Sequence, residues 1–132
     1  MPFPATSSTS LATDDQFALL ALKAHITLDP YQVLTADWTN SSSVCNSWIG
    51  ITCSSSHQRV ASLNISNTGP TGTIPSQLGN LSFLVSLDLK YNFFSVTLPQ
   101  ELSHLHWLEI IALRINNFSG DILMWFGFLP KL

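Results

Sequence analysis

A fixed interval of 24 residues relates equivalent apolar positions along the second half of the chain. Six apolar columns keep this interval: Leu81/Leu105/Leu129, Leu84/Leu108/Leu132, Leu63/Leu87/Ile111, Ile65/Leu89/Leu113, Ile74/Leu98/Ile122 and Leu78/Leu102/Phe126. Two more columns follow it, with Asn92 recurring as Asn116 and Phe94 as Phe118. A repeat of this length is typical of a solenoid, in which each coil buries its apolar side only by stacking on its neighbours.

Each repeat also predicts a short strand. Pairs of apolar residues two positions apart place both side chains on one face of a strand, and these pairs are Leu63/Ile65, Leu87/Leu89 and Ile111/Leu113. Stacking the coils then lays the strands side by side in a parallel sheet. Asn92 and Asn116 follow two of these strands, where a side-chain amide can satisfy backbone groups that a bend leaves unpaired. Gly72 and Gly120 are expected to permit a tight backbone turn.

The segment before the repeats predicts one helix. Thr13 and Gln16 fit a capping box, in which each side chain satisfies a backbone N–H at the helix start. Apolar residues then recur at helical spacing on two stripes, which are Phe17/Leu20/Ala21/Ala24/Leu28 and Leu19/Leu22/Ile26. Asp29 and Pro30 are expected to end the helix. Residues 1–12 are expected to lack regular structure.

The charge balance excludes one broad class of function. Only 10% of the residues are charged, and five Lys+Arg against eight Asp+Glu give a net charge of −3. This chain lacks the basic surface that neutralises phosphates, which argues against nucleic-acid binding. The hydrophobic fraction of 45% argues against an intrinsically disordered chain.

The two cysteines, Cys45 and Cys53, favour a disulfide over two free thiols. Two cysteines cannot complete a tetrahedral zinc site, and their spacing differs from that of redox motifs. A disulfide that closes so short a loop would stabilise the fold by about 2–3 kcal/mol on the chain-entropy model, and it would require an oxidising compartment. Trp38 and Trp48 flank this loop and are expected to be core aromatics.

Evidence on the location of the protein conflicts. The first thirteen residues have neither a basic region nor an apolar run typical of a signal peptide, and no stretch has the length of a membrane span. Four Asn-x-Ser/Thr sequons favour a secreted protein, as the cysteines do; they begin at Asn40, Asn64, Asn80 and Asn117. We give more weight to the interior of the chain and expect that an N-terminal segment precedes it.

No pattern for catalysis or metal binding stands out. His104 and His106 are two residues apart beside Trp107, but no carboxylate or cysteine cluster accompanies them. Neither a Ser-His-Asp nor a Cys-His arrangement can be placed. We therefore expect no catalytic residue, no metal and no cofactor.

The repeats resemble a known family. The pattern LxxLxxLxLxxNxFxGxIPxxLGxL, seen most fully from Gly72 to Leu81 and from Leu84 to Leu102, resembles plant-specific leucine-rich repeats. The preceding residues, which include Trp38 and the stretch from Cys45 to Cys53, resemble the N-terminal cap of such proteins. The chain is thus similar to the extracellular region of plant leucine-rich-repeat receptor-like serine/threonine kinases, particularly the class with immune receptors for bacterial patterns.

The resemblance implies an α/β fold, namely a right-handed leucine-rich-repeat solenoid with a helical, disulfide-bearing N-terminal cap. Residues 13–58 would form the cap, and 59–132 would form three repeats and the start of a fourth. Such a module recognises a protein or peptide ligand at the cell surface, sometimes with a co-receptor kinase, in defence or developmental signalling. It would be a glycoprotein and not itself an enzyme, because the kinase motifs are absent from this chain.

Residues that alternate with the buried columns would form the concave face, where such proteins bind ligands. The chemically marked positions are Ser66, Asp88, Lys90, Tyr91 and Arg114, although ordinary solvated strand residues would give the same pattern. Two hypotheses remain open. The chain is a fragment of a receptor-like kinase, or it is a short secreted leucine-rich-repeat binding or inhibitor protein without a kinase.

Overall fold

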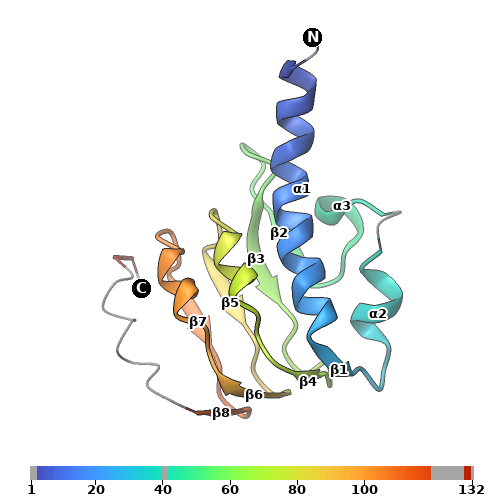
Figure 1. The fold of residues 1–132 in the computed structure, drawn as a ribbon, viewed down its shortest axis with the longest axis vertical. Helices are drawn as coiled ribbons and strands as arrows, with labels where there is room; N and C mark the ends of the chain where they lie inside the picture. Colours follow the sequence, from blue (N-terminus) through green and yellow to red (C-terminus); the bar gives the residue numbers. More distant parts are fainter. Residues whose placement is uncertain (1–2, 40–41, 120–129, 132) are drawn as a thin grey trace.

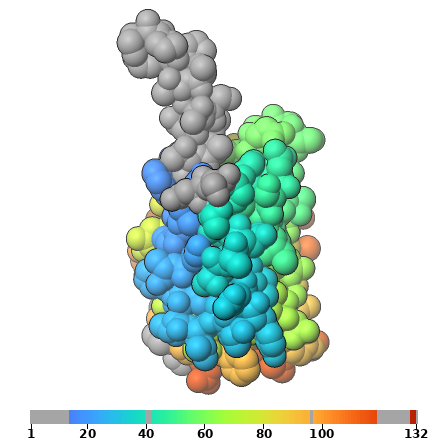
Figure 2. Space-filling model, turned by 90° about the vertical axis from the view of Figure 1, so that its right-hand side faces the viewer, coloured from blue at the N-terminus to red at the C-terminus, as the bar shows by residue number. Residues whose placement is uncertain are grey.

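The computed structural model describes residues 3–39, 42–119 and 130–131. A long helix, α1 (Phe3–Ala24), lies beside a stack of coils, and two short helices, α2 (Val33–Asp37) and α3 (Val44–Ser47), lie next to it (Figure 1). Residues 14–39 cover the side of the molecule seen in Figure 2. The coils carry two sheets, and short 3₁₀ helices complete the turns between them.

The first sheet confirms the predicted repeat. Its strand order is β2 (Ile51–Cys53), β3 (Val60–Asn64), β5 (Ser86–Asp88) and β7 (Ile110–Ala112). The last three are parallel, and Leu63 pairs with Leu87, which pairs with Ile111. These partners are members of one 24-residue column. β2 pairs antiparallel with β3 and so joins the N-terminal segment to the first coil.

A second sheet on the other side of the coils was not predicted. It contains β1 (Ile26–Leu28), β4 (Thr71–Gly72), β6 (Phe93–Thr97) and β8 (Asn117–Ser119) in that order. β4, β6 and β8 are parallel, whereas β1 joins antiparallel. β4 has only two residues, which is too short for an alternation of apolar and polar side chains to be visible in the sequence.

The 3₁₀ helices η1 (Ser76–Asn80) and η2 (Gln100–His104) form a row with α1, because α1 packs against η1 and η1 packs against η2. Leucines from successive coils fill the interior between this row and the first sheet, and Leu78, Leu81, Leu84, Leu87, Leu102, Leu105 and Leu108 are fully buried. Phe94 and Phe118 stack with their ring centroids 6.4 Å apart. Within the described residues, the apolar columns therefore form one continuous core. Their last members, Ile122, Phe126, Leu129 and Leu132, lie outside the described residues.

The predicted role of the asparagines is confirmed. The Asn92 amide donates to the carbonyl oxygens of Ile65 and Leu89, while its oxygen accepts from the backbone N–H groups of Thr68 and Gly69. Asn116 repeats both donations one coil later, to Leu89 and Leu113, and its oxygen accepts from the backbone N–H of Phe94. In the first coil Thr68 occupies this column, and its hydroxyl donates to the Ile65 carbonyl at 2.6 Å.

The predicted bounds of the first helix are wrong at both ends. The helix begins at Phe3 rather than at Thr13, so residues 3–12 are helical. No glycine interrupts this stretch, and Pro4 stands in the first turn, where its missing N–H has no intrahelical partner to lose. The helix ends at Ala24, before Asp29, because residues 26–28 instead pair with β4.

Asp29 begins the next helix rather than ending the first. Its carboxylate accepts from the backbone N–H groups of Val33, Leu34 and Thr35, which are the first three residues of α2. Those N–H groups have no partner within the helix, so the carboxylate both satisfies them and complements the helix dipole. The prediction that Asp29 ends the first helix is therefore wrong, because it stabilises the start of α2.

Only one of the two predicted apolar stripes of α1 is buried. Leu19 and Leu22 are fully buried, whereas Phe17 is 65% exposed and Leu28 59% exposed. Gly72 also differs from its predicted role, because it lies inside β4 with no left-handed φ. A Cβ at Gly72 would collide with the carbonyl oxygen of His25, so close backbone approach is what requires glycine there. Gly120 lies outside the described residues.

The cysteines and tryptophans pack as one unit beside α1. Cys45 of α3 and Cys53 of β2 form a disulfide with a Cα–Cα distance of 5.5 Å. Trp38 and Trp48 are buried and stacked, with ring centroids 5.3 Å apart. Their indole N–H groups donate to the Ile49 carbonyl and the Ser42 hydroxyl. The expectation that both are core aromatics is confirmed.

Candidate binding face

The five predicted face residues lie at the ends of consecutive strands of the first sheet. Asp88 ends β5, Lys90 and Tyr91 follow it, Ser66 follows β3, and Arg114 follows β7. Because β3, β5 and β7 are in register, Ser66, Lys90 and Arg114 occupy equivalent positions in three coils. We call Ser66, Asp88, Lys90, Tyr91, Arg114 and the neighbouring exposed isoleucines Ile110 and Ile115 the candidate face.

A short polar turn ends two of these strands in the same way. The backbone N–H of Lys90 donates to Asp88 Oδ1 at 3.1 Å, and that of Ser66 donates to Asn64 Oδ1 at the same distance. The Ser66 hydroxyl also donates to Asn64 Oδ1 at 2.7 Å. Lys90 Nζ lies 3.6 Å from Asp88 Oδ2, a surface ion pair worth about 0–1 kcal/mol. Asp88 thus neutralises the lysine beside it.

Tyr91 and Arg114 contact each other across adjacent coils. Arg114 Nη2 donates to Tyr91 Oη at 2.9 Å, and Arg114 Cζ lies 5.6 Å from the centroid of the Tyr91 ring. A cation above an exposed aromatic ring contributes about 0.5–1 kcal/mol. The contact holds the guanidinium in one orientation on the surface of the face.

Arg114 retains donors for a ligand. Among the side chains that the structure places, Arg59 and Lys90 form ion pairs with carboxylates, whereas Arg114 contacts a neutral phenol. A guanidinium offers five N–H donors in a planar fork that matches a carboxylate. The candidate face can therefore bind an anionic group at Arg114.

Exposed apolar side chains belong to the same face as this cation. Tyr91 is 43% exposed, Ile110 56% and Ile115 61%. The backbone φ is 59° at both Tyr91 and Ile115, and 54° at Asn67 one coil earlier. A non-glycine residue in this left-handed region costs about 1–2 kcal/mol. The strained bend recurs once per coil and places Tyr91 and Ile115 in one exposed column, whereas Ile110 belongs to another column.

Both isoleucines belong to columns expected on the concave face, because Ile110 aligns with Ser62 and Ser86, and Ile115 aligns with Asn67 and Tyr91. The structure adds the left-handed bend at Ile115, which the columns do not reveal. The face offers cationic, aromatic and aliphatic contacts but brings no nucleophile beside a base. That combination suits binding of a peptide or protein surface.

The predicted histidine and sequon sites lie outside this face, except that Asn64 contacts its member Ser66. His104 is in η2 and His106 follows it, both exposed, and within the described ranges no three His, Cys, Asp or Glu residues gather as a metal site would require. Among the sequons, Asn64, Asn80 and Asn117 are exposed, with Asn64 at the edge of the candidate face. Asn40 lies outside the described residues.

The one resolved pKa shift belongs to a structural group. Hydrogen bonding to Asp15 raises the pKa of the Arg59 guanidinium, and burial opposes this effect. A pocket of about 400 Å³ lies between α1 and η1, and a smaller one of about 180 Å³ lies near Cys45. Neither pocket is lined by a residue of the candidate face. No helix in the part of the chain that the structure describes could cross a membrane.

Comparison with known proteins agrees with the repeat and its N-terminal segment. Residues 12–54 match the family model of the leucine rich repeat N-terminal domain, and residues 83–105 match that of the leucine rich repeat. The chain is 42% identical over 83 residues to the LRR receptor-like serine/threonine-protein kinase EFR of Arabidopsis thaliana. The match covers 63% of this chain but only 8% of that relative.

Solved structures agree on the arrangement. The Arabidopsis receptor kinase HAESA, in complex with the peptide hormone IDA and the co-receptor SERK1, aligns with a TM-score of 0.78 and 29% identity. The alignment covers 90% of this chain and 20% of that chain. A plant ice-binding protein aligns with a TM-score of 0.81 and 29% identity, over 91% of this chain and 38% of that chain.

Proposed function

We propose that this chain, which carries a leucine-rich-repeat N-terminal domain followed by leucine-rich repeats, is part of the extracellular ligand-recognition region of a plant receptor-like kinase. Its relatives include such kinases, and the HAESA structure contains a peptide hormone and a co-receptor. The role is recognition without catalysis. The fold is a right-handed solenoid whose helical cap, from residue 13 to residue 58, closes the first coil.

The candidate face supports this function most directly. Arg114 is oriented by Tyr91 and flanked by exposed isoleucines, and it pairs with no carboxylate among the placed side chains. Side chains on stacked strands are rigidly positioned, which lowers the entropy that binding must overcome. The ligand is a peptide or protein segment with an acidic group next to apolar residues. A co-receptor kinase would be a second partner.

Selection from a random peptide library tests this function. Peptides that bind the immobilised chain are expected to carry Asp, Glu or a free carboxylate beside apolar residues. Arg114→Glu should weaken binding of the selected peptides by at least about 10-fold, because it replaces attraction by repulsion. Lys131→Glu makes the same charge change at a lysine that contacts Trp107 rather than the face, and it should leave binding unchanged. Equal losses in both variants would contradict the assignment.

The plant ice-binding protein, of which this chain covers 38%, supports a second candidate function. In that alternative the chain belongs to a short secreted leucine-rich-repeat protein that binds or inhibits another protein and has no kinase. Sequencing the full transcript separates the two. A downstream apolar span of about 20 residues followed by kinase motifs supports the receptor, whereas a stop codon after a few more repeats supports the secreted protein.

A further inference from the structure

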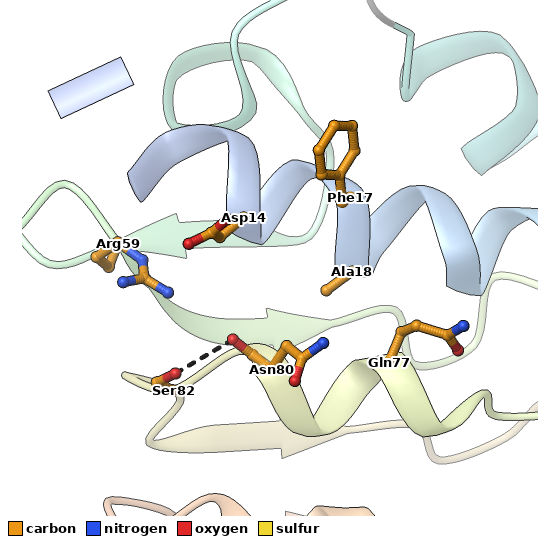
Figure 3. Close-up of a pocket in the computed structure, with 7 residues that line it drawn as sticks. All are labelled: Asp14, Phe17, Ala18, Arg59, Gln77, Asn80 and Ser82. Atoms are coloured by element: carbon orange, nitrogen blue, oxygen red, sulfur yellow. Dashed lines mark hydrogen bonds between the residues drawn. The ribbon is translucent and has the colours of Figure 1, made fainter. Parts of the chain in front are cut away.

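A pocket of about 400 Å³ lies along the contact between α1 and η1, and its lining includes the sequon residue Asn80 (Figure 3). Asp14, Phe17 and Ala18 line the pocket from α1, while Gln77 and Asn80 line it from η1. The pocket thus lies between the N-terminal segment and the first repeat. Its volume is within the range of pockets that hold small organic ligands.

Asn80 is available for modification. It is exposed at the end of η1, and within the described part of the chain no hydrogen bond engages its side-chain amide. The Ser82 hydroxyl, which completes the sequon, donates only to the Asn80 carbonyl oxygen at 3.3 Å. By contrast, the Asn64 side chain already accepts two hydrogen bonds from Ser66.

The pocket offers what a sugar ring requires. A pyranose has an apolar face of C–H groups and a rim of hydroxyls. Phe17, from a predicted core stripe, is instead 65% exposed at the α1 side of this pocket. Asp14 and Gln77 supply hydrogen-bonding groups at its walls. An exposed aromatic ring, polar walls and a sequon amide therefore lie around one cavity.

We propose that Asn80 carries an N-linked glycan whose first N-acetylglucosamine residues lie across this pocket toward Phe17. Transfer from a lipid-linked pyrophosphate oligosaccharide forms a bond from sugar C1 to Asn80 Nδ2. The C1–O bond to the pyrophosphate breaks, the pyrophosphate leaves with the electron pair, and the amide loses a proton. The proposal rests on the proposed extracellular function, because this transfer takes place in the secretory pathway. The glycan joins α1 to the first repeat.

Glycopeptide mass spectrometry tests the attachment. The chain is secreted from eukaryotic cells behind a leader peptide and digested. Most copies are expected to carry hexosamine at Asn80, Ser82→Ala should abolish it, and Ser82→Thr should retain it. An unmodified Asn80 beside modified Asn64 or Asn117 would overturn the proposal and leave the receptor assignment standing. Secreted chains with no modified sequon would overturn the proposal, and the peptide-library result would still decide the recognition function independently.

A thermal double-mutant comparison tests the position of the glycan. Phe17→Ala should lower the Tm of the glycosylated chain by about 2–6 °C, and it should have no effect in an Asn80→Gln background. Phe93→Ala is the matched control, because Phe93 is 63% exposed but lies on β6, away from this pocket. A Phe17→Ala effect that is equal with and without the glycan would overturn the contact.

Discussion

Asp15 of α1 and Arg59, which precedes β3, form a bidentate ion pair 44 residues apart in sequence. Arg59 Nε lies 2.9 Å from Asp15 Oδ2, and Nη2 lies 2.7 Å from Oδ1. Asp15 Oδ2 also accepts from the backbone N–H of Val60 at 2.8 Å. Asp15 is 2% exposed and Arg59 5%. One carboxylate therefore joins the N-terminal helix to the first strand of the repeat, and Phe83 of the next coil lies 4.9 Å from the arginine.

Removing the charge of Asp15 is expected to destabilise the fold strongly. Asp15→Asn keeps the shape but leaves a buried guanidinium without its carboxylate, which should lower the free energy of unfolding by about 3 kcal/mol. Urea denaturation followed by tryptophan fluorescence measures the change. Asp14→Asn is the matched control, because Asp14 is exposed one residue earlier, and it should change stability by less than about 0.5 kcal/mol. Equal effects would show that the pair does not hold the two parts together.

The contribution of Arg59 should not depend on pH near neutrality. Hydrogen bonding to Asp15 raises the pKa of Arg59 above its ordinary value, so its stabilisation is fully present below the unfolded-state pKa. That contribution is lost only when the pH rises through the folded-state pKa, far above neutrality. The stability difference between Asp15→Asn and the parent chain should therefore be the same at about pH 6 and about pH 9. If the stability difference between the two chains were halved at the higher pH, Arg59 would be losing its proton in this range, which contradicts its raised pKa.

Of the two stacked asparagines, Asn92 and Asn116, which we call the amide ladder, Asn92 is expected to contribute more to stability. Asn92→Ala leaves the backbone N–H groups of Thr68 and Gly69 without their acceptor. The Ile65 and Leu89 carbonyls each lose one donor and keep another. The substitution should therefore cost about 2–4 kcal/mol of unfolding free energy. Thr68→Val removes only the hydrogen bond to Ile65 and should cost about 1 kcal/mol. Chemical denaturation ranks the two variants, and the opposite order would refute the ladder as a main source of stability.

The left-handed bend predicts a stabilising substitution. Ile115 has a φ of 59° and is 61% exposed, so Ile115→Asn relieves backbone strain and loses little buried area. Asparagine tolerates this conformation, and the unfolding free energy should rise by about 0.5–1 kcal/mol. Asn67→Ile is the reciprocal control at the equivalent position and should destabilise by a similar amount. A loss of stability in Ile115→Asn would mean that the isoleucine packs more than its exposure indicates.

The disulfide is expected to stabilise the N-terminal segment. Replacing both Cys45 and Cys53 by serine should lower the unfolding free energy by about 2–3 kcal/mol, the value for a short closed loop. Dithiothreitol should lower the Tm of the parent chain but not that of the double variant. Alkylation without reductant, read by mass spectrometry, should label neither cysteine of secreted protein. Two labelled thiols would show that the bond does not form.

Sequence alone predicted the repeating columns and the first sheet, but not the strands β4, β6 and β8 of the second sheet. The columns that contain Leu63, Leu87 and Ile111 became paired positions of one sheet, and the Asn92 column became the amide ladder. Periodicity reveals such features because equivalent positions of each coil have the same surroundings and therefore carry the same residue types. The cysteine pair was predictable from composition and context, and the face residues were predictable as positions but not as contacts.

The tertiary structure decided what occurs once. The end of α1 at Ala24 and the strand at Ile26–Leu28 depend on pairing with β4, whose residues are 43 and 46 positions further along the chain. The Asp15–Arg59 pair, the exposure of Phe17 and the orientation of Arg114 by Tyr91 also depend on distant segments that meet only after the coils stack. The 24-residue period is visible in the sequence itself, and it was therefore enough to predict the repeat and its buried columns. Contacts between unlike segments have no period, so only the folded chain could show how the first helix joins the repeats and how Tyr91 orients Arg114.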